Sequence, residues 1–113
     1  MPDGYDYLKC LLTEPVTVTN VAATLASKLA ATAFETTTTS ITLENMDDTA
    51  ILYWKFVPAG EAAPTVVTEM LVIPPLTGRL LPYNKADLER IYVLSSAASQ
   101  LAGVVQSGRR AKN

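Results

Sequence analysis

The chain has 113 residues, of which 49% are hydrophobic and 18% charged, with a net charge of −2 and no histidine. This length fits one domain with a modest core and leaves little room for an elaborate active-site cleft. The slight acidity argues against nucleic acid as a main partner, because phosphate backbones are bound by basic surfaces. The charged fraction is below the quarter or so that is usual, which predicts that a neighbouring subunit covers some apolar surface.

Most catalytic and metal-binding chemistry lacks its usual residues here. Without histidine there is no common general base and no Ser–His triad, and a single cysteine, Cys10, forms neither an internal disulfide nor a thiolate metal cage. The five glycines are too scattered for a phosphate-binding loop. Glu44, Asp47 and Asp48 lack the spacing of a calcium loop and are interpreted as a solvated turn. We therefore expect no enzyme activity, cofactor, metal or small-molecule substrate.

No apolar run approaches the ~20 residues that span a bilayer, and the first residues, MPDGYDYLKC, lack the form of a secretory signal. The sequence therefore predicts a chain that is made in the cytoplasm and has no membrane partner.

The first third of the chain predicts an arm, a short strand and a helix. Residues 1–15 mix tyrosines and leucines with charged residues and are interpreted as an extended arm that Pro15 ends, with an edge strand over residues 8–12 as the alternative. The alternating residues 16–19 predict a half-buried strand. Asn20 is expected to cap an Ala-rich helix over residues 21–33, with a strand and loop as the competing interpretation.

The centre of the chain, ITLENMDDTAILYWKFV at residues 41–57, predicts a hairpin. Threonines 36–39 lead into its first strand, and Asp47-Asp48-Thr49 forms the turn. Beyond the turn, Leu52 and Trp54 alternate with Ile51 and Tyr53, as in a strand that is covered on both faces or shows one face to a partner.

The remaining elements are short. Residues 58–64 are a proline-bracketed loop, residues 65–73 a strand that Pro74-Pro75 ends, and residues 85–89 a helical turn. Residues 90–95 and 100–106 are the last two strands, with Gly103 marking a close backbone approach or a bulge.

Six or seven short strands with regular turn signals predict a mainly β protein, an antiparallel β-sandwich of jelly-roll or Greek-key type with one short Ala-rich helix. The predicted organisation is an N-terminal arm over residues 1–15, a sandwich domain over residues 16–107 and a basic flexible tail over residues 108–113.

Residues 40–106, about two-thirds of the chain, resemble small structural proteins of tailed bacteriophages. The resemblance lies in the rhythm of strands and turns, at residues 43–45, Tyr53, residues 74–78, residues 91–93 and residues 101–105. It implies a sandwich domain on the virion, and a capsid cement (decoration) protein is the first choice, with a tail, connector or head-fibre component as the alternative. The implied partners are the major capsid protein and further copies of the chain, as a dimer or trimer, and the implied location is the capsid surface.

Two sets of residues are candidates for these contacts. The arm contributes residues for contact with the shell, namely Tyr5, Tyr7, Leu8, Leu11 and Leu12. Three residues of the predicted sheet are candidates for self-association, namely Tyr53, Met70 and Tyr92.

A function of another class is a small carbohydrate-binding sandwich. Trp54 with Tyr53, Tyr83 and Tyr92 would then form a platform on which sugars stack. The alternation of Trp54 with Leu52 and Phe56 favours a place in the core instead.

Overall fold

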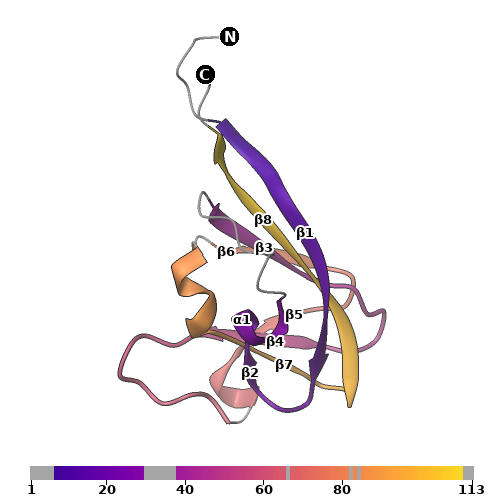
Figure 1. The fold of residues 1–113 in the computed structure, drawn as a ribbon. Helices are drawn as coiled ribbons and strands as arrows, with labels where there is room; N and C mark the ends of the chain where they lie inside the picture. The colour runs from indigo at the N-terminus through magenta and orange to yellow at the C-terminus, as the bar shows by residue number, and fades with distance from the viewer. Residues whose placement is uncertain (1–6, 30–37, 66, 82, 84, 111–113) are drawn as a thin grey trace.

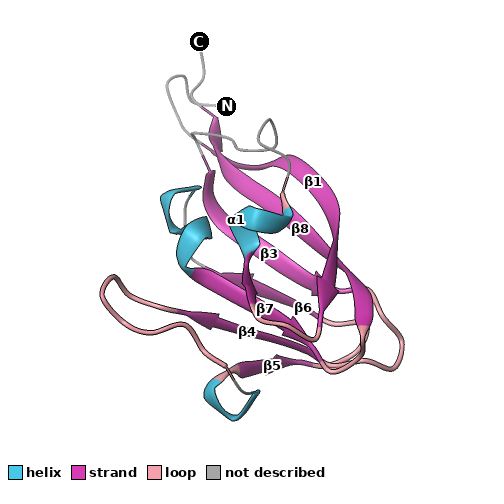
Figure 2. Ribbon diagram, turned by 60° about the horizontal axis from the view of Figure 1, so that its bottom comes forward, coloured by secondary structure: helices cyan, strands magenta, loops and turns pink. Residues whose placement is uncertain are grey.

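The computed structural model describes residues 7–29, 38–65, 67–81, 83 and 85–110, and in this part of the chain two four-stranded antiparallel sheets pack face to face (Figures 1 and 2). The first sheet contains, in spatial order, β1 (Tyr7–Thr19), β8 (Ser99–Arg110), β3 (Thr38–Asn45) and β6 (Gly78–Leu81). The second contains β2 (Ala23–Thr24), β7 (Ile91–Ser95), β4 (Leu52–Phe56) and β5 (Leu71–Ile73). Three short helical segments accompany them: α1 (Leu25–Lys28), η2 (Val67–Glu69) and η3 (Lys85–Arg90).

The strand pairing is that of a jelly roll. The first strand pairs with the last, β2 with β7, β3 with β6 and β4 with β5, so the chain is one long hairpin that has been rolled into two sheets. This arrangement confirms the predicted antiparallel sandwich and its single short α-helix. It also determines which strands lie at the edges of the sheets: β1 and β2 lie along one side of the sandwich and β5 and β6 along the other.

The core lies between the two sheets and is built by alternate residues of each strand. Val16 and Val18 of β1 face the same interior as Leu52 and Trp54 of β4, and all four are buried. The same cluster includes Leu25, Ile41, Leu43, Ile73, Leu81, Leu88, Ile91, Val93, Ala102 and Val104.

The predicted hairpin over residues 41–57 is wrong, because its two strands belong to different sheets. β3 pairs with β6 and β8, whereas β4 pairs with β5 and β7. The turn at Asp47-Asp48-Thr49 exists, but it forms a corner between the sheets. Both strands of a sandwich bury one face, so their alternation looks the same whether they are neighbours or lie opposite one another.

The predicted boundary at Pro15 is also wrong, because β1 passes through this residue without a break and Pro15 lies opposite Gly103 of β8. Proline is tolerated there because β1 is an edge strand, whose outer side needs no hydrogen-bond donor. The alternative of an edge strand in this region is the one that the structure contains. At the other end of the chain, β8 continues to Arg110, into the stretch predicted to be a flexible tail.

Two further elements are shorter than predicted. The α-helix covers only Leu25–Lys28, and its cap is Thr24, whose hydroxyl oxygen accepts a hydrogen bond from the backbone N–H of Ser27 at 3.3 Å, so Asn20 is not the cap. Residues 30–33 lie outside the described residues. The strand predicted over residues 65–73 consists of the 3-10 turn η2 followed by only three strand residues.

The predicted positions of the last helical turn and the last two strands are confirmed. The helical turn over residues 85–89 is η3, and the strands over residues 90–95 and 100–106 are β7 and part of β8. No helix within the described ranges has the length and apolar character needed to cross a membrane.

Candidate assembly surfaces

A cluster of buried polar side chains closes one end of the sandwich. Asn45, at the end of β3, donates from its side-chain amide to the carbonyl oxygens of Ala50, at 2.8 Å, and Ile73, at 3.1 Å. Its side-chain oxygen accepts from the Gln100 amide at 2.7 Å, and the Gln100 oxygen accepts from the Ser95 hydroxyl at 2.6 Å. Because Asn45, Ser95 and Gln100 come from three strands of both sheets, this cluster, here called the polar corner, ties the sheets together.

Asp47 organises the turn next to the polar corner. One oxygen of its carboxylate accepts hydrogen bonds from the backbone N–H groups of Ala50, at 2.6 Å, and Thr49, at 2.9 Å. These two hydrogen bonds, first that from Ala50 and then that from Thr49, lower the pKa of the Asp47 carboxyl below its ordinary value. The carboxylate is therefore an internal cap of the turn, which accounts for the aspartate without a calcium ion.

The turn between β5 and β6 is attached to the same corner by two backbone hydrogen bonds. The Leu76 N–H donates to the carbonyl oxygen of Asp47 at 3.1 Å, and the carbonyl oxygen of Thr77 accepts from the Asn45 N–H at 2.8 Å. Leu76 has a φ of 55°, and within the described residues it is the one non-glycine residue with a positive φ. Its side chain is 70% exposed. A bulky apolar residue thus occupies a backbone conformation that glycine or asparagine adopts more easily, and it projects into solvent.

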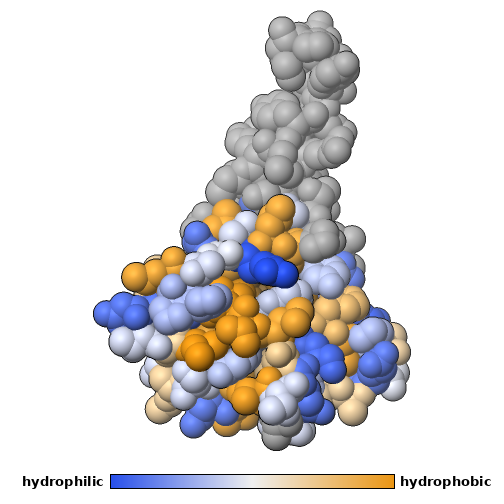
Figure 3. Space-filling view, turned by 180° about the vertical axis from the view of Figure 1, so that it is seen from behind, coloured by the Kyte–Doolittle hydropathy of each residue, from blue (hydrophilic) through white to orange (hydrophobic). Residues whose placement is uncertain are grey.

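Exposed apolar side chains are concentrated on the same side of the molecule. Five of the large hydrophobic residues that are exposed come from η2, β5, the turn after β5, and β6; we call this set the β5–β6 surface, and it consists of Val67, Leu71, Val72, Leu76 and Leu80. The set lies along one edge of the sandwich, with Leu80 on the outer face of the first sheet and Val72 on the outer face of the second. β5 and β6 are the edge strands of the two sheets on one side of the sandwich. The view from behind shows hydrophobic residues gathered across the middle of the face (Figure 3). Surfaces of this kind are typical of binding sites.

Only part of the predicted self-association set is accessible. Met70 is 8% exposed and packs inside, so its prediction as a contact residue is wrong; η2 interrupts the alternation on which it was based. Tyr53 and Tyr92 are half-buried. They lie on the outer face of the second sheet, since Tyr53 pairs with Val72 and Leu94 and Tyr92 pairs with Lys55, while Trp54 faces the core.

The predicted shell-contact set lies in or before the first half of β1. Tyr7, Leu8, Leu11 and Leu12 are strand residues, and Tyr7 lies opposite Arg110 at the far end of β8. β1 and β8 run together past the ends of the other strands (Figure 1). Tyr5 lies outside the described residues. The four described residues of the set therefore belong to a projecting two-stranded ribbon.

The structure places Trp54 in the core, with 7% of its surface exposed. The predicted core position of this residue is confirmed, and a sugar-stacking platform centred on it is ruled out. Tyr83 stacks on Phe56 with ring centroids 4.5 Å apart, so it too packs against the protein's own side chains.

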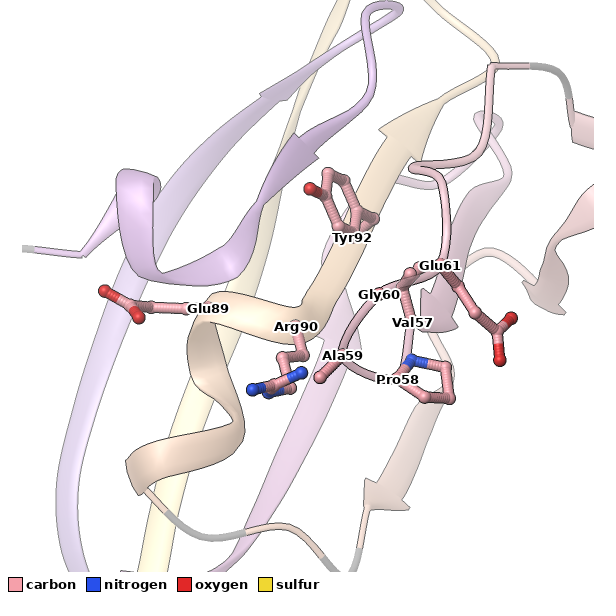
Figure 4. A pocket seen from close by; sticks show the side chains of 8 residues that line it. All are labelled: Val57, Pro58, Ala59, Gly60, Glu61, Glu89, Arg90 and Tyr92. Atoms are coloured by element: carbon pink, nitrogen blue, oxygen red, sulfur yellow. The ribbon is translucent and has the colours of Figure 1, made fainter.

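A shallow depression of about 240 Å³ lies between the loop after β4 and the start of β7. Its lining includes Ala59, Glu61, Glu89 and Arg90, and the two carboxylates point away from each other while Arg90 lies beside Ala59 (Figure 4). Polar groups that diverge do not hold a small ligand. Among the described residues, no group of three or more histidine, cysteine or acidic side chains is placed to bind a metal.

Sequence reasoning missed the β5–β6 surface. The predicted strand over residues 65–73 was apolar on both faces, and this composition was the available signal. The signal for Leu76 is weaker: a leucine that follows Pro74-Pro75 and precedes Gly78 stands in a turn, where its side chain has no core to enter.

Comparison with known proteins supports the fold. No protein-family model matches this chain, and no curated protein matches it significantly in sequence. A solved structure of a chain from Bacillus endospore appendages, described as a novel family of disulfide-linked pili, has a similar fold, with a TM-score of 0.50 and 13% sequence identity over 100% of this chain and 96% of that chain. At this level of identity the similarity concerns the fold, and it agrees with the two-sheet architecture described above.

Proposed function

We propose that this chain is a non-enzymatic structural protein that holds the subunits of a larger assembly together. The observation that carries the proposal is the β5–β6 surface, where a stable sandwich leaves large apolar side chains in solvent along one edge. The fold similarity to an appendage chain supports the same class of function. Such a protein acts through buried contact area, repeated in many copies, so it needs no reactive groups.

The first candidate assembly is a bacteriophage capsid, with the chain as a cement protein. This role is supported by the resemblance of residues 40–106 to small phage structural proteins and by the projecting β1–β8 ribbon, which extends away from the sandwich. The ribbon, with Tyr5, Tyr7, Leu8, Leu11 and Leu12, is the proposed contact with the major capsid protein. Each copy would add buried contact area between neighbouring shell subunits, and many copies together would raise the free energy needed to rupture the shell.

The second candidate is a fibre or appendage subunit, including a tail, connector or head-fibre component of a virion. The fold of the endospore appendage chain favours it. Cys10 sets a limit here, because this sequence has one cysteine and a polymer held by disulfides alone needs at least two per subunit. A fibre of this chain would therefore depend on noncovalent contacts, with at most one disulfide joining a pair of chains.

The deciding experiment is the copy number of the chain in purified particles from its source, measured by quantitative mass spectrometry against the most abundant shell protein. A ratio near one to one, or a simple fraction of it, supports cement. A ratio of a few per hundred, or recovery with surface appendages, supports the second candidate. Absence from virions and appendages alike overturns the structural role.

The shell contact is tested separately with variants of the ribbon. The double variant Tyr5→Ser and Tyr7→Ser should reduce binding to shells that lack the protein, measured by co-sedimentation, and Leu101→Ser, on an exposed residue of β8, is the matched control. Point variants are needed because deletion of residues 1–14 would remove more than half of β1 and expose the edge of β8. Undiminished binding by the double variant would remove the ribbon from the contact.

A further inference from the structure

We propose that the outer face of the first sheet binds the basic C-terminal end of a second copy of this chain, with Glu44 as the anion that receives it. The inference rests on the proposed structural function and gives its second candidate, a fibre or appendage subunit, a contact between copies. The contact lies on strands β3, β6 and β8, and it shares only Leu80 with the β5–β6 surface.

The first observation is that Glu44 lies between two glycines. In the strand register it pairs with Gly78 of β6 on one side and with Gly103 of β8 on the other. A Cβ on Gly103 would lie 3.1 Å from Oε1 of Glu44, and a Cβ on Gly78 would lie 3.3 Å from Cγ of Glu44. Glycine weakens a strand, yet both cross-strand neighbours of Glu44 are glycines, and the missing side chains leave the space in which the Glu44 side chain lies against the sheet.

The second observation is that this carboxylate has no partner of its own. Glu44 is exposed, and its side chain makes no hydrogen bond or ion pair with the residues that the structure describes. Asp47 and Asp48 lie in the corner beyond β3, and Arg79, which pairs with Leu43, belongs by register to the inner side of β6. Within residues 15–19, 40–46, 78–81 and 99–106, Glu44 is therefore the one charged side chain on the outer face.

Exposed apolar side chains surround Glu44 on the same face. Leu80 of β6 and Leu101 of β8 both have the register of the outer face, and both are more than half exposed. The Met46 side chain extends over Gly103, since its sulfur would lie 3.4 Å from a Cβ at that position. An unpaired carboxylate among exposed apolar side chains fits a partner segment that supplies a cation.

The sequence itself contains such a segment. Residues 107–113, SGRRAKN, hold three basic residues and no acidic residue, whereas the rest of the chain holds six basic and eleven acidic residues. The first nine residues lead into the same end of the ribbon and contain Asp3, Asp6 and Lys9, so this end of the chain stays positive when they are counted. A second copy therefore supplies the charge that complements Glu44.

The basic end cannot reach Glu44 of its own chain. Glu44 pairs with Gly103, and β8 continues from there as a strand to Arg110, at the tip of the ribbon (Figure 1). Seven strand residues at roughly 3.3 Å each place the backbone of Arg110 about 23 Å from that of Gly103, and Lys112 follows too closely to return over this distance. The charge pair can thus form only between copies. Each copy has one basic end and one such face, so the contact can be repeated from copy to copy.

The test uses the full chain and two charge-reversed variants, Glu44→Lys and the double variant Arg109→Glu with Arg110→Glu. In sedimentation velocity from micromolar to near-millimolar concentration, the wild type should associate reversibly, and each variant alone should associate at least about tenfold more weakly. An equal mixture of the two variants should associate like the wild type, because reversed ends then meet reversed faces and unaltered ends meet unaltered faces. Association of the wild type should weaken as the salt concentration rises.

The matched control is Asp48→Lys, which makes the same change of charge at an exposed position in the corner next to β3. It should associate within about twofold of the wild type, since its charge lies off the outer face and is screened by salt. Circular dichroism verifies that every variant is folded before its association is compared.

Four results would overturn the inference. Association of Glu44→Lys at wild-type strength would place the contact elsewhere, and equal weakening by Asp48→Lys would assign the effect to the charge of the whole corner. A mixture of the two folded variants that associates as weakly as each alone would separate Glu44 from the basic end. A monomeric wild type at every concentration would exclude a second copy as the partner, and the copy number in particles would still decide the proposed structural function independently.

Discussion

Two adjoining regions of the molecule depart from the usual separation of polar and apolar side chains, in opposite directions. In the polar corner, Asn45, Ser95 and Gln100 are buried. On the β5–β6 surface, Leu76 and Leu80 are exposed. The regions adjoin, since the N–H of Asn45 donates to the carbonyl oxygen of Thr77, the residue after Leu76.

The difference between them is where each finds compensation. The buried polar groups are compensated inside the chain, because each of the three side chains has hydrogen-bond partners within 3.1 Å. The exposed apolar groups cannot be compensated by hydrogen bonds, and only removal from water stabilises them. Buried polar side chains are therefore explained by the fold itself, whereas exposed apolar side chains indicate a partner.

The largest predicted effect breaks the polar corner. Asn45→Ala removes two hydrogen bonds to carbonyl oxygens and leaves the Gln100 amide without its acceptor in a buried place. We expect the free energy of unfolding to fall by about 3 kcal/mol, and the melting temperature by about 10 °C. Urea titration followed by circular dichroism measures the loss.

The control for this variant is Asp48→Ala, in the same turn but exposed. Its free energy of unfolding should change by less than about 0.5 kcal/mol. Equal effects of the two variants would mean that the turn as a whole, and not the buried network, is responsible for stability.

The fold class follows from the sequence because period-two alternation and turn signals are local. β7 and most of β8 were predicted near their observed positions for this reason. The pairing was not predictable in the same way. Residues 41–57 show alternation on both sides of a turn, and neither alternation nor turn chemistry distinguishes a hairpin from a corner between two sheets. The strands that pair with β3 and β4 lie far away in the sequence, and no pattern within a single sequence identifies them.

The candidate surface was predictable only in outline. The high share of apolar residues and the low charged fraction indicated that a neighbouring subunit covers some apolar surface. Which residues form it depends on where strands end. η2 replaces the first part of the strand predicted over residues 65–73, so Met70 turns inward and Leu71 and Val72 are exposed. The positive φ of Leu76 arises from hydrogen bonds to residues about thirty positions earlier, which the local sequence does not contain.

The next effect in size concerns pH and the turn that joins the two regions. Because backbone hydrogen bonds lower the pKa of Asp47 in the folded state, its contribution to stability is present above its unfolded pKa, near 4, and is lost as the pH falls through the folded value. Asp47→Asn cannot titrate. The difference in free energy of unfolding between wild type and variant should be constant above about pH 5 and should narrow below about pH 4. Thermal unfolding at a series of pH values measures it, and a difference that stays constant down to about pH 2 would contradict the role given to the carboxylate.

The smallest predicted effect on the free energy of unfolding tests the contrast between the polar corner and the β5–β6 surface most directly. Asparagine adopts a positive φ more readily than leucine, so Leu76→Asn should leave the free energy of unfolding of the monomer unchanged or raise it by up to about 1 kcal/mol. Urea titration measures this change. A variant that unfolds no more easily than the wild type would show that the fold does not need the leucine, as expected of a side chain that contacts another subunit. If the variant instead lost about 2 kcal/mol or more, Leu76 would have a role in the fold itself, and the surface would no longer contrast with the polar corner beside it.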